Sequence, residues 1–157
     1  MTTSRRALLA AAALCLPALA ALAQQPPAGI AVEQPWMRAA VQGGTGGAFV
    51  TLRSTGAQAD RLVSASSPAA RAVELHNTVR DGDVMRMQPV PSIEIPAGGS
   101  VTLQPGGLHI MLVGLAQAAR PGSTVPLTLN FERSGAVTVQ LAVQAPGARG
   151  AAAPMHH

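Results

Sequence analysis

The sequence contains no lysine and no tyrosine, and aromatic residues make up only 2% of its 157 residues. Nucleic-acid-binding proteins use a basic stripe to contact phosphates and aromatic rings to stack on bases. Here the basic residues are all arginines scattered along the chain, and the rings are limited to Trp36, Phe49 and Phe131. We therefore expect no nucleic-acid partner, although the formal net charge is +4.

Cysteine is nearly absent as well, because Cys15 is the only one in the chain. It lies in a segment typical of a secretory signal peptide: basic residues come first, then an uncharged run from Ala7 to Ala18, then Ala21-Leu22-Ala23 as a small-x-small cleavage site. A buried helix would not explain this order. The uncharged run is shorter than the roughly 20 residues that a membrane span needs. We therefore predict that residues 1–23 are a cleavable signal peptide, that the protein is periplasmic and that the mature chain has no membrane span.

The mature chain from Gln24 onward would contain no cysteine. This excludes disulfides, thiolate metal sites and cysteine nucleophiles, and it excludes the blue-copper class of electron-transfer site, which needs a cysteine ligand. Leu14 precedes Cys15 where a lipoprotein signal has a small residue, so we expect no lipid anchor. The Arg5-Arg6 pair is compatible with twin-arginine export, which the sequence does not distinguish from the general secretory route.

The rest of the chain divides into a Pro-rich lead-in at 24–29, a β-rich domain at 30–144 and a Gly/Ala/Pro-rich tail at 145–157, which we expect to be disordered. Apolar and polar residues alternate through 127–131, which is typical of a strand with one buried face. The predicted strands are 30–38, 48–53, 60–65, 72–76, 84–87, 92–95, 100–103, 108–113, 124–131 and 136–143. Many short strands without an amphipathic helix predict a single all-β domain, a sandwich or barrel.

Histidines and methionines in this domain share strand faces that the core does not need. His109 and Met111 are two residues apart, so their side chains leave the same face of a strand while Ile110 points the other way. Met85 and Met87 share a face by the same rule. Thioether sulfur and imidazole nitrogen are neutral, soft or borderline donors, and together they favour Cu(I) over magnesium, calcium or zinc.

A structural role would explain the same residues when each is taken alone. Methionine commonly fills gaps in a core, and a histidine near a strand end, such as His76, is often only an exposed polar residue. The residue pattern by itself therefore leaves open both a metal site and a metal-free β-sandwich that binds another partner.

The spacing of four of these residues resembles that of a known family. His76, ten residues, Met87, twenty-one residues, His109, one residue and Met111 match H-x10-M-x21-H-x-M, the signature of the periplasmic copper chaperones called the PCu(A)C family. The resemblance covers roughly residues 30–143. The flanking blocks that are similar to the family are Pro35–Arg38, Ala65–Pro68, Val73–His76, Ile95–Gly99 and Leu103–Leu112.

This resemblance implies a cupredoxin-like Greek-key β-sandwich that holds one Cu(I). It implies that the ion is bound by His76, Met87, His109 and Met111. It further implies delivery of the ion to the dinuclear copper centre of cytochrome c oxidase, alongside a thiol-bearing partner of the Sco type. A periplasmic copper storage or resistance protein is the alternative, because storage and delivery differ in partners and release rate rather than in ligands.

Two further methionines and the end of the tail are secondary candidates. Met85, on the face of Met87, is a candidate substitute ligand or a wall of the site, with packing as the simpler interpretation. Met37 stands where the family more often has a small residue, and we interpret it as packing that could line the site. The tail ends in Met155-His156-His157, which is either an inert terminus or a separate Cu(II) site, since imidazole nitrogens favour Cu(II).

An enzyme is not expected from this sequence. Its seven carboxylates include no recognisable acid/base pair, and a redox copper enzyme would need an open site rich in nitrogen ligands. We expect a monomer whose partner is a copper-accepting protein, either a cytochrome c oxidase subunit or a Sco-type thiol protein.

Overall fold

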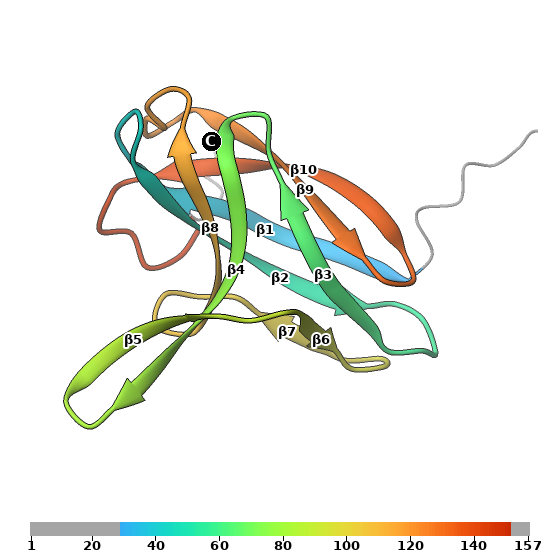
Figure 1. The fold of residues 1–157 in the computed structure, drawn as a ribbon. Helices are drawn as coiled ribbons and strands as arrows, with labels where there is room; N and C mark the ends of the chain where they lie inside the picture. Colours follow the sequence, from blue (N-terminus) through green and yellow to red (C-terminus); the bar gives the residue numbers. More distant parts are fainter. Residues whose placement is uncertain (1–28, 152–157) are drawn as a thin grey trace, which may run out of the picture.

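The computed structural model describes residues 29–151, which contain ten β-strands and no helix (Figure 1). The predicted signal peptide, most of the lead-in and the Met155-His156-His157 cluster lie outside the described residues. Within the described range, no segment forms a helix that is long and apolar enough to cross a membrane. The strands are β1 (Ile30–Arg38), β2 (Thr45–Ser54), β3 (Asp60–Ser66), β4 (Ala70–Asp81), β5 (Val84–Pro89), β6 (Ile93–Ile95), β7 (Ser100–Thr102), β8 (Leu108–Leu115), β9 (Thr124–Phe131) and β10 (Gly135–Gln144).

Each predicted strand corresponds to one strand of the structure, so the all-β expectation is confirmed. The largest difference is in β4, where the apolar pattern predicts an end at His76 and the strand continues to Asp81. Residues 77–81 pair with β5 across a turn in which Gly82 has a φ of 62°. Hydrogen bonding to β5, rather than burial of an apolar face, therefore extends β4 beyond the predicted end.

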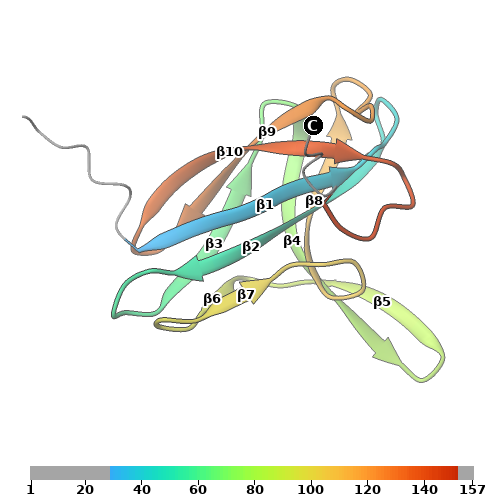
Figure 2. The same cartoon turned by 180° about the vertical axis from the view of Figure 1, so that it is seen from behind.

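The strands form one curled sheet in the order β5-β4-β8-β2-β1-β10-β9-β3-β6, and β7 pairs with β2. Neighbouring strands are antiparallel except for β1 and β10, which are parallel. Because the sheet curls, β3 and β4 lie side by side although they are far apart in the pairing order (Figures 1 and 2). The result is the cupredoxin-like Greek-key β-sandwich that the resemblance to the PCu(A)C family implies.

Alternate residues of the strands fill the interior of the sandwich. In β9 the side chains of Val125, Leu127, Leu129 and Phe131 are buried, and the polar residues between them are less so. Burial of one such leucine contributes about 1.5–3 kcal/mol relative to exposure. This interior holds β4 and β8 in a defined register, which is the pairing that matters for the candidate site.

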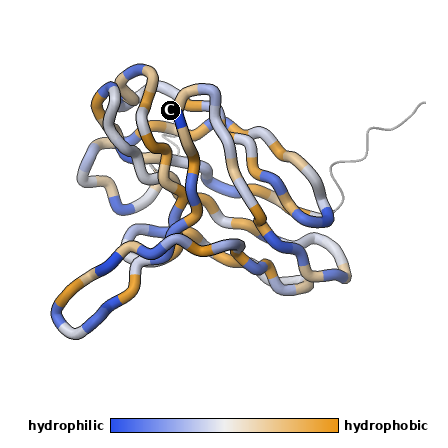
Figure 3. The backbone as a smooth tube through the Cα atoms, in the orientation of Figure 1, coloured by the Kyte–Doolittle hydropathy of each residue, from blue (hydrophilic) through white to orange (hydrophobic). Residues whose placement is uncertain are grey.

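Residues 77–89, at the outer end of β4 and in β5, project from the sandwich as a two-stranded ribbon that we call the arm (Figures 1 and 3). Every residue of β5 is exposed, and the exposed fractions of Val84, Met85 and Met87 are 54%, 55% and 61%. The arm therefore presents apolar side chains to solvent and has no core of its own.

The first part of the tail differs from the expectation of disorder. Arg38 Nε donates a hydrogen bond of 2.8 Å to the carbonyl oxygen of Ala148, and the Ala148 N–H donates one of 3.0 Å to the Ala145 carbonyl. Residues 145–151 therefore return to the body of the sandwich. Composition could not predict this contact, because it depends on one arginine of β1 that reaches a backbone carbonyl more than a hundred positions away.

Candidate metal centre

The candidate site begins with two histidines that face each other across adjacent strands. His76 of β4 is paired in register with His109 of β8, and their ring centroids are 5.7 Å apart. Glu74 and Met111 are the next pair on the same face, because side chains two residues apart in a strand point the same way. The β4–β8 pairing thus places His76, His109 and Met111 together, as the metal-site prediction requires.

His109 is held in one orientation by its own strand. Its ring is buried, with 4% of the residue exposed, and Nδ1 lies 2.9 Å from the Gly107 carbonyl oxygen. A carbonyl can only accept, so Nδ1 carries the proton and Nε2 keeps a free lone pair. Nε2 is buried and has no hydrogen-bond partner. A buried polar atom without a partner is costly, and a ligand at Nε2 would remove that cost.

His76 has the complementary arrangement. Its Nε2 donates to Glu74 Oε2 at 2.8 Å, and its Nδ1 is buried without a hydrogen-bond partner. The His76 side chain is only 14% exposed, whereas the Glu74 side chain is 51% exposed. A carboxylate bound to the far nitrogen of a histidine fixes the orientation and the tautomer of the ring, as is usual for metal-ligating histidines. Each of the two rings therefore offers one unpaired nitrogen.

Two methionine sulfurs are the remaining candidate donors. A pocket of about 250 Å³ is lined by Met87, His109 and Met111 together with residues of β1, β2 and the 105–106 turn. Met87 comes from the arm, where it is paired with Thr78, and it reaches this pocket although it is largely exposed. His76 does not line the pocket and lies beside it, against the His109 ring. Three of the four predicted ligands therefore line one pocket, and the fourth, His76, lies against one of them, His109.

Several residues around the site could not be recognised from the sequence. Phe49 of β2 lies beside His109, with ring centroids 6.5 Å apart, and the ring centroid of Trp36 lies 4.6 Å from that of Phe49. The Arg38 guanidinium lies 5.8 Å from the Phe49 ring centroid. The buried His109 ring therefore has the buried aromatic side chains of Phe49 and Trp36 on its β2 side. Trp36 and Arg38 belong to a block that resembles the family, but the sequence does not indicate that Phe49 lies beside His109, because this depends on the pairing between β2 and β8.

The secondary candidates occupy different environments. Met37 is completely buried in the hydrophobic core, and its methyl group lies so close to Gly46 that a Cβ there would be 2.6 Å away. Gly46 also lines the pocket, so Met37 packs behind the site rather than in it. Met85 lies further out on the arm, opposite Arg80. The Met155-His156-His157 cluster is outside the described residues.

The donor set suits a soft, monovalent cation. Among residues 29–151, no three His, Cys, Asp or Glu side chains come together in a way that could hold a metal ion. The candidate donors are instead two neutral imidazoles and two thioethers, which fit Cu(I) better than zinc or a hard cation.

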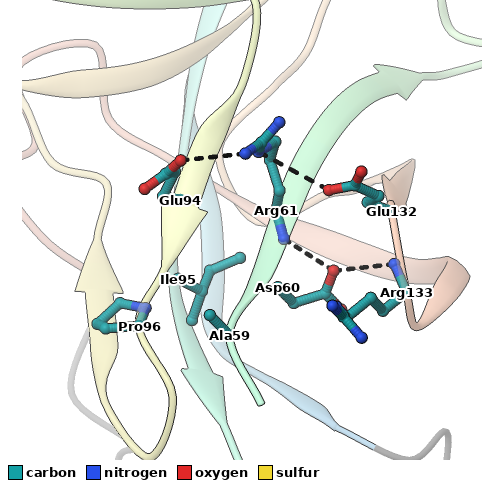
Figure 4. A pocket seen from close by; sticks show the side chains of 8 residues that line it. All are labelled: Ala59, Asp60, Arg61, Glu94, Ile95, Pro96, Glu132 and Arg133. Carbon is teal, nitrogen blue, oxygen red and sulfur yellow. Dashed lines mark hydrogen bonds and ion pairs between the residues drawn. The ribbon is translucent and has the colours of Figure 1, made fainter.

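A second pocket of about 250 Å³ has a different character (Figure 4). In it, Arg61 lies between Glu94, at 3.2 Å, and Glu132, at 3.8 Å. Asp60 accepts hydrogen bonds from the backbone N–H groups of Arg61 and Arg133. The charges here are paired with one another, and no histidine or methionine lines the pocket, so it is not a candidate for the same chemistry.

Comparison with known proteins agrees with the fold. Residues 30–143 match the family described as "Putative lipoprotein LpqE-like". The chain is also 36% identical over 137 residues to "Putative lipoprotein Lxx21020" of Leifsonia xyli subsp. xyli (strain CTCB07), covering 87% of this chain and 82% of that protein.

Solved structures with the same fold include the apo PCuAC domain of PmoF2, at a TM-score of 0.65 and 31% identity over 78% of this chain and 95% of that one. The copper-bound PCuAC domain from PmoF2 has a TM-score of 0.65 and 30% identity over 75% and 94% of the two chains. The solution structure of Cu(I)-DR1885 from Deinococcus radiodurans has a TM-score of 0.57 and 31% identity over 74% and 80%. With this fold and these matches, the chain belongs to the LpqE-like family and is a domain of the PCuAC type.

Proposed function

We propose that this protein is a periplasmic copper chaperone that carries one Cu(I) and delivers it to a copper enzyme. The ion would be bound by four side chains. These are His76 through Nδ1, His109 through Nε2, and Met87 and Met111 through sulfur.

One observation carries the proposal. The two buried nitrogens without hydrogen-bond partners belong to histidines that are direct cross-strand neighbours, and each ring is oriented through its other nitrogen. Two such nitrogens beside two thioethers form a neutral donor set, so a single positive charge can be bound without a buried counter-charge.

The relatives support the identity of the ion. One PCuAC structure is described as copper-bound, and the DR1885 structure is described as the Cu(I) form. Both are at least 30% identical to this chain. Cu(I) as cargo is consistent with thioether donors, which favour the reduced ion.

Delivery is favoured over storage by the exposure of one candidate ligand. Met87 lies on the arm and is 61% exposed, so an acceptor can approach its sulfur from solvent. We propose the dinuclear copper centre of cytochrome c oxidase, directly or through a Sco-type thiol protein, as the acceptor. Thiolates bind Cu(I) more tightly than thioethers do, so the ion would move toward a cysteine-bearing partner.

We also propose that the chain is exported, through the signal at residues 1–23. The name "lipoprotein" of the matching family and of the Leifsonia relative supports export. Leu14 before Cys15 argues against lipidation of this chain, and intact-mass measurement of the exported protein would distinguish a cleaved, unmodified N-terminus from an acylated cysteine.

The direct test is an anaerobic titration of the mature protein with Cu(I) against a chromogenic chelator. The comparison is a His109→Ala/Met111→Leu double variant, which removes one nitrogen and one sulfur from the same strand. We expect one tight equivalent for the wild type and its loss in the variant. Equal binding by the two proteins, or binding by neither, would overturn the proposal.

A further inference from the structure

We infer that Met85 is a second, weaker Cu(I) site through which the ion enters and leaves the centre. The inference rests on the proposed function and extends it outward along the arm. The thioether of Met85 would be the first donor that an acceptor or donor protein meets, and Met87 would be the next.

The environment of Met85 argues against a packing role. A methionine that fills a core gap is buried among apolar neighbours. Met85 is 55% exposed, in a strand whose residues are all exposed, on an arm that has no core. Met85 is not an isolated case, because Val84 and Met87 of the same strand are exposed as well. Exposed apolar side chains that gather on one element are typical of an interaction site.

The pairing of β4 with β5 places Met85 on the same face of the sheet as the candidate ligands Met87 and His76. Met85 is paired with Arg80, Met87 with Thr78, and the next pair on the same face is His76 with Pro89. His76 is in turn paired with His109 on β8. One face of the sheet therefore carries Met85, Met87 and the histidine pair in order. Residues two apart in a strand are separated by about 6.5–7 Å, a gap that two flexible methionine side chains can share.

The charged side chains around Met85 favour weak, short-lived binding of Cu(I) over tight binding. Arg80 lies directly opposite Met85, and its guanidinium is held by a hydrogen bond of 3.2 Å from Nε to the Gly82 carbonyl oxygen. Arg86, the nearest cation along β5, is paired with Asp81 at 3.6 Å. An arginine opposite the sulfur repels a bound cation, so Cu(I) at Met85 would be held less tightly than at the neutral His/Met centre.

The transfer step is a ligand exchange. On release, the Met85 sulfur and the two thiolates of the acceptor form bonds to copper as the bonds to His76, His109 and Met111 break, and the bond to the Met87 sulfur breaks last. Loading follows the reverse order. Copper remains Cu(I) throughout, and no proton or electron is transferred, because each of these donors binds copper through a lone pair.

The test compares equilibrium affinity with transfer rate in the full mature protein. Met85→Leu conserves volume on an exposed strand, so the fold should be unaffected. A Val84→Met/Met85→Leu double variant is the matched control, because it restores the thioether on the opposite face of the arm. We expect both variants to bind the first equivalent of Cu(I) as tightly as the wild type. We expect both to transfer it several-fold more slowly to a protein-sized dithiol acceptor, a reduced thioredoxin-type protein, in stopped-flow measurements.

A second measurement follows the methionine methyl groups by nuclear magnetic resonance during anaerobic titration with Cu(I). We expect the first equivalent to shift the Met87 and Met111 methyl signals, and an excess to shift that of Met85. An unmoved Met85 signal together with wild-type transfer rates in both variants would overturn the inference alone. Absence of a tight first equivalent in the wild type would instead overturn the proposed function, and with it the inference.

Discussion

At the scale of single residues, the candidate centre depends on which nitrogen of each histidine is free. The Gly107 carbonyl binds Nδ1 of His109, and the Glu74 carboxylate binds Nε2 of His76. These two acceptors leave opposite ring nitrogens unpaired in the two histidines. The tautomers are therefore set in the metal-free protein, which would lower the cost of organising the two rings as ligands.

Glu74→Gln should weaken Cu(I) binding although Glu74 is not itself a candidate ligand. An amide accepts the Nε2–H less strongly than a carboxylate, and it can also rotate to donate and select the wrong tautomer of His76. Loss of such a supporting group usually costs about 10–100-fold in metal affinity. Chelator competition would measure the change, with Glu94→Gln, a carboxylate paired with Arg61 in the second pocket, as the control. Unchanged affinity in Glu74→Gln would mean that His76 needs no carboxylate to bind the ion.

Met87→Leu should reduce Cu(I) affinity and leave stability almost unchanged. The substitution removes the sulfur but conserves volume, and the residue is 61% exposed, so little packing is lost. Competition with a chelator would measure the affinity, and thermal unfolding of the apo protein would measure stability. Wild-type affinity in this variant would remove Met87 from the ligand set.

At the scale of elements, a hydrogen-bonded aspartate fastens the start of β3 to the turn between β9 and β10. Asp60 Oδ1 accepts from the N–H groups of Arg61 and Arg133, and Oδ2 accepts from the N–H and the hydroxyl of Ser134. Burial favours the neutral acid, but the hydrogen bonds from Ser134, Arg133 and Arg61 outweigh it and hold the pKa of Asp60 below its usual value.

This lowered pKa gives Asp60 a defined pH dependence. Because the folded-state pKa lies below the unfolded-state pKa, the contribution to stability is complete above the unfolded value, near 3.9, and is lost as the pH falls through the folded value. Asp60→Asn should therefore lower the free energy of unfolding at neutral pH by about 1–3 kcal/mol, because the amide leaves buried donors unsatisfied. The variant should also lose less stability than the wild type below about pH 4. Urea unfolding at pH 7 and pH 3 would measure both effects. If the free energy of unfolding falls by the same amount between these pH values in the two proteins, the pH dependence does not come from Asp60.

At the scale of the whole molecule, binding of Cu(I) should stabilise the fold, because the ligands come from strands that are adjacent only in the folded chain. A ligand present at about 100 times its Kd adds about 2.7 kcal/mol to the free energy of unfolding. Anaerobic calorimetry should therefore show a higher Tm with Cu(I) for the wild type and no shift for His109→Ala/Met111→Leu. A similar shift in the double variant would place the bound copper elsewhere.

The sequence predicts much of this architecture and part of the site. Apolar alternation locates strands such as β9, because burial on one face leaves a pattern of period two. The same signal does not extend to residues 77–81 of β4, which are held by pairing with β5 and not by a core. Spacing along the chain brings His109 and Met111 to one face, but the contact of His76 with His109 depends on strand register. The bonds from Glu74 and Gly107 that choose the tautomers are equally dependent on the folded geometry.

β4 begins inside the sandwich and ends in the arm, so one continuous strand joins a rigid part of the molecule to a slender one. Of the four candidate ligands, His76, His109 and Met111 lie on the sandwich, and Met87 lies on the arm. A ribbon without a core bends more readily than a packed sandwich. A protein that binds the arm could then bend it at β4 and move the Met87 sulfur away from the ion while the other three candidate ligands stay in place. Bending of the arm by a bound partner would in that case control copper release, in addition to competition between the donors of the partner and those of this protein.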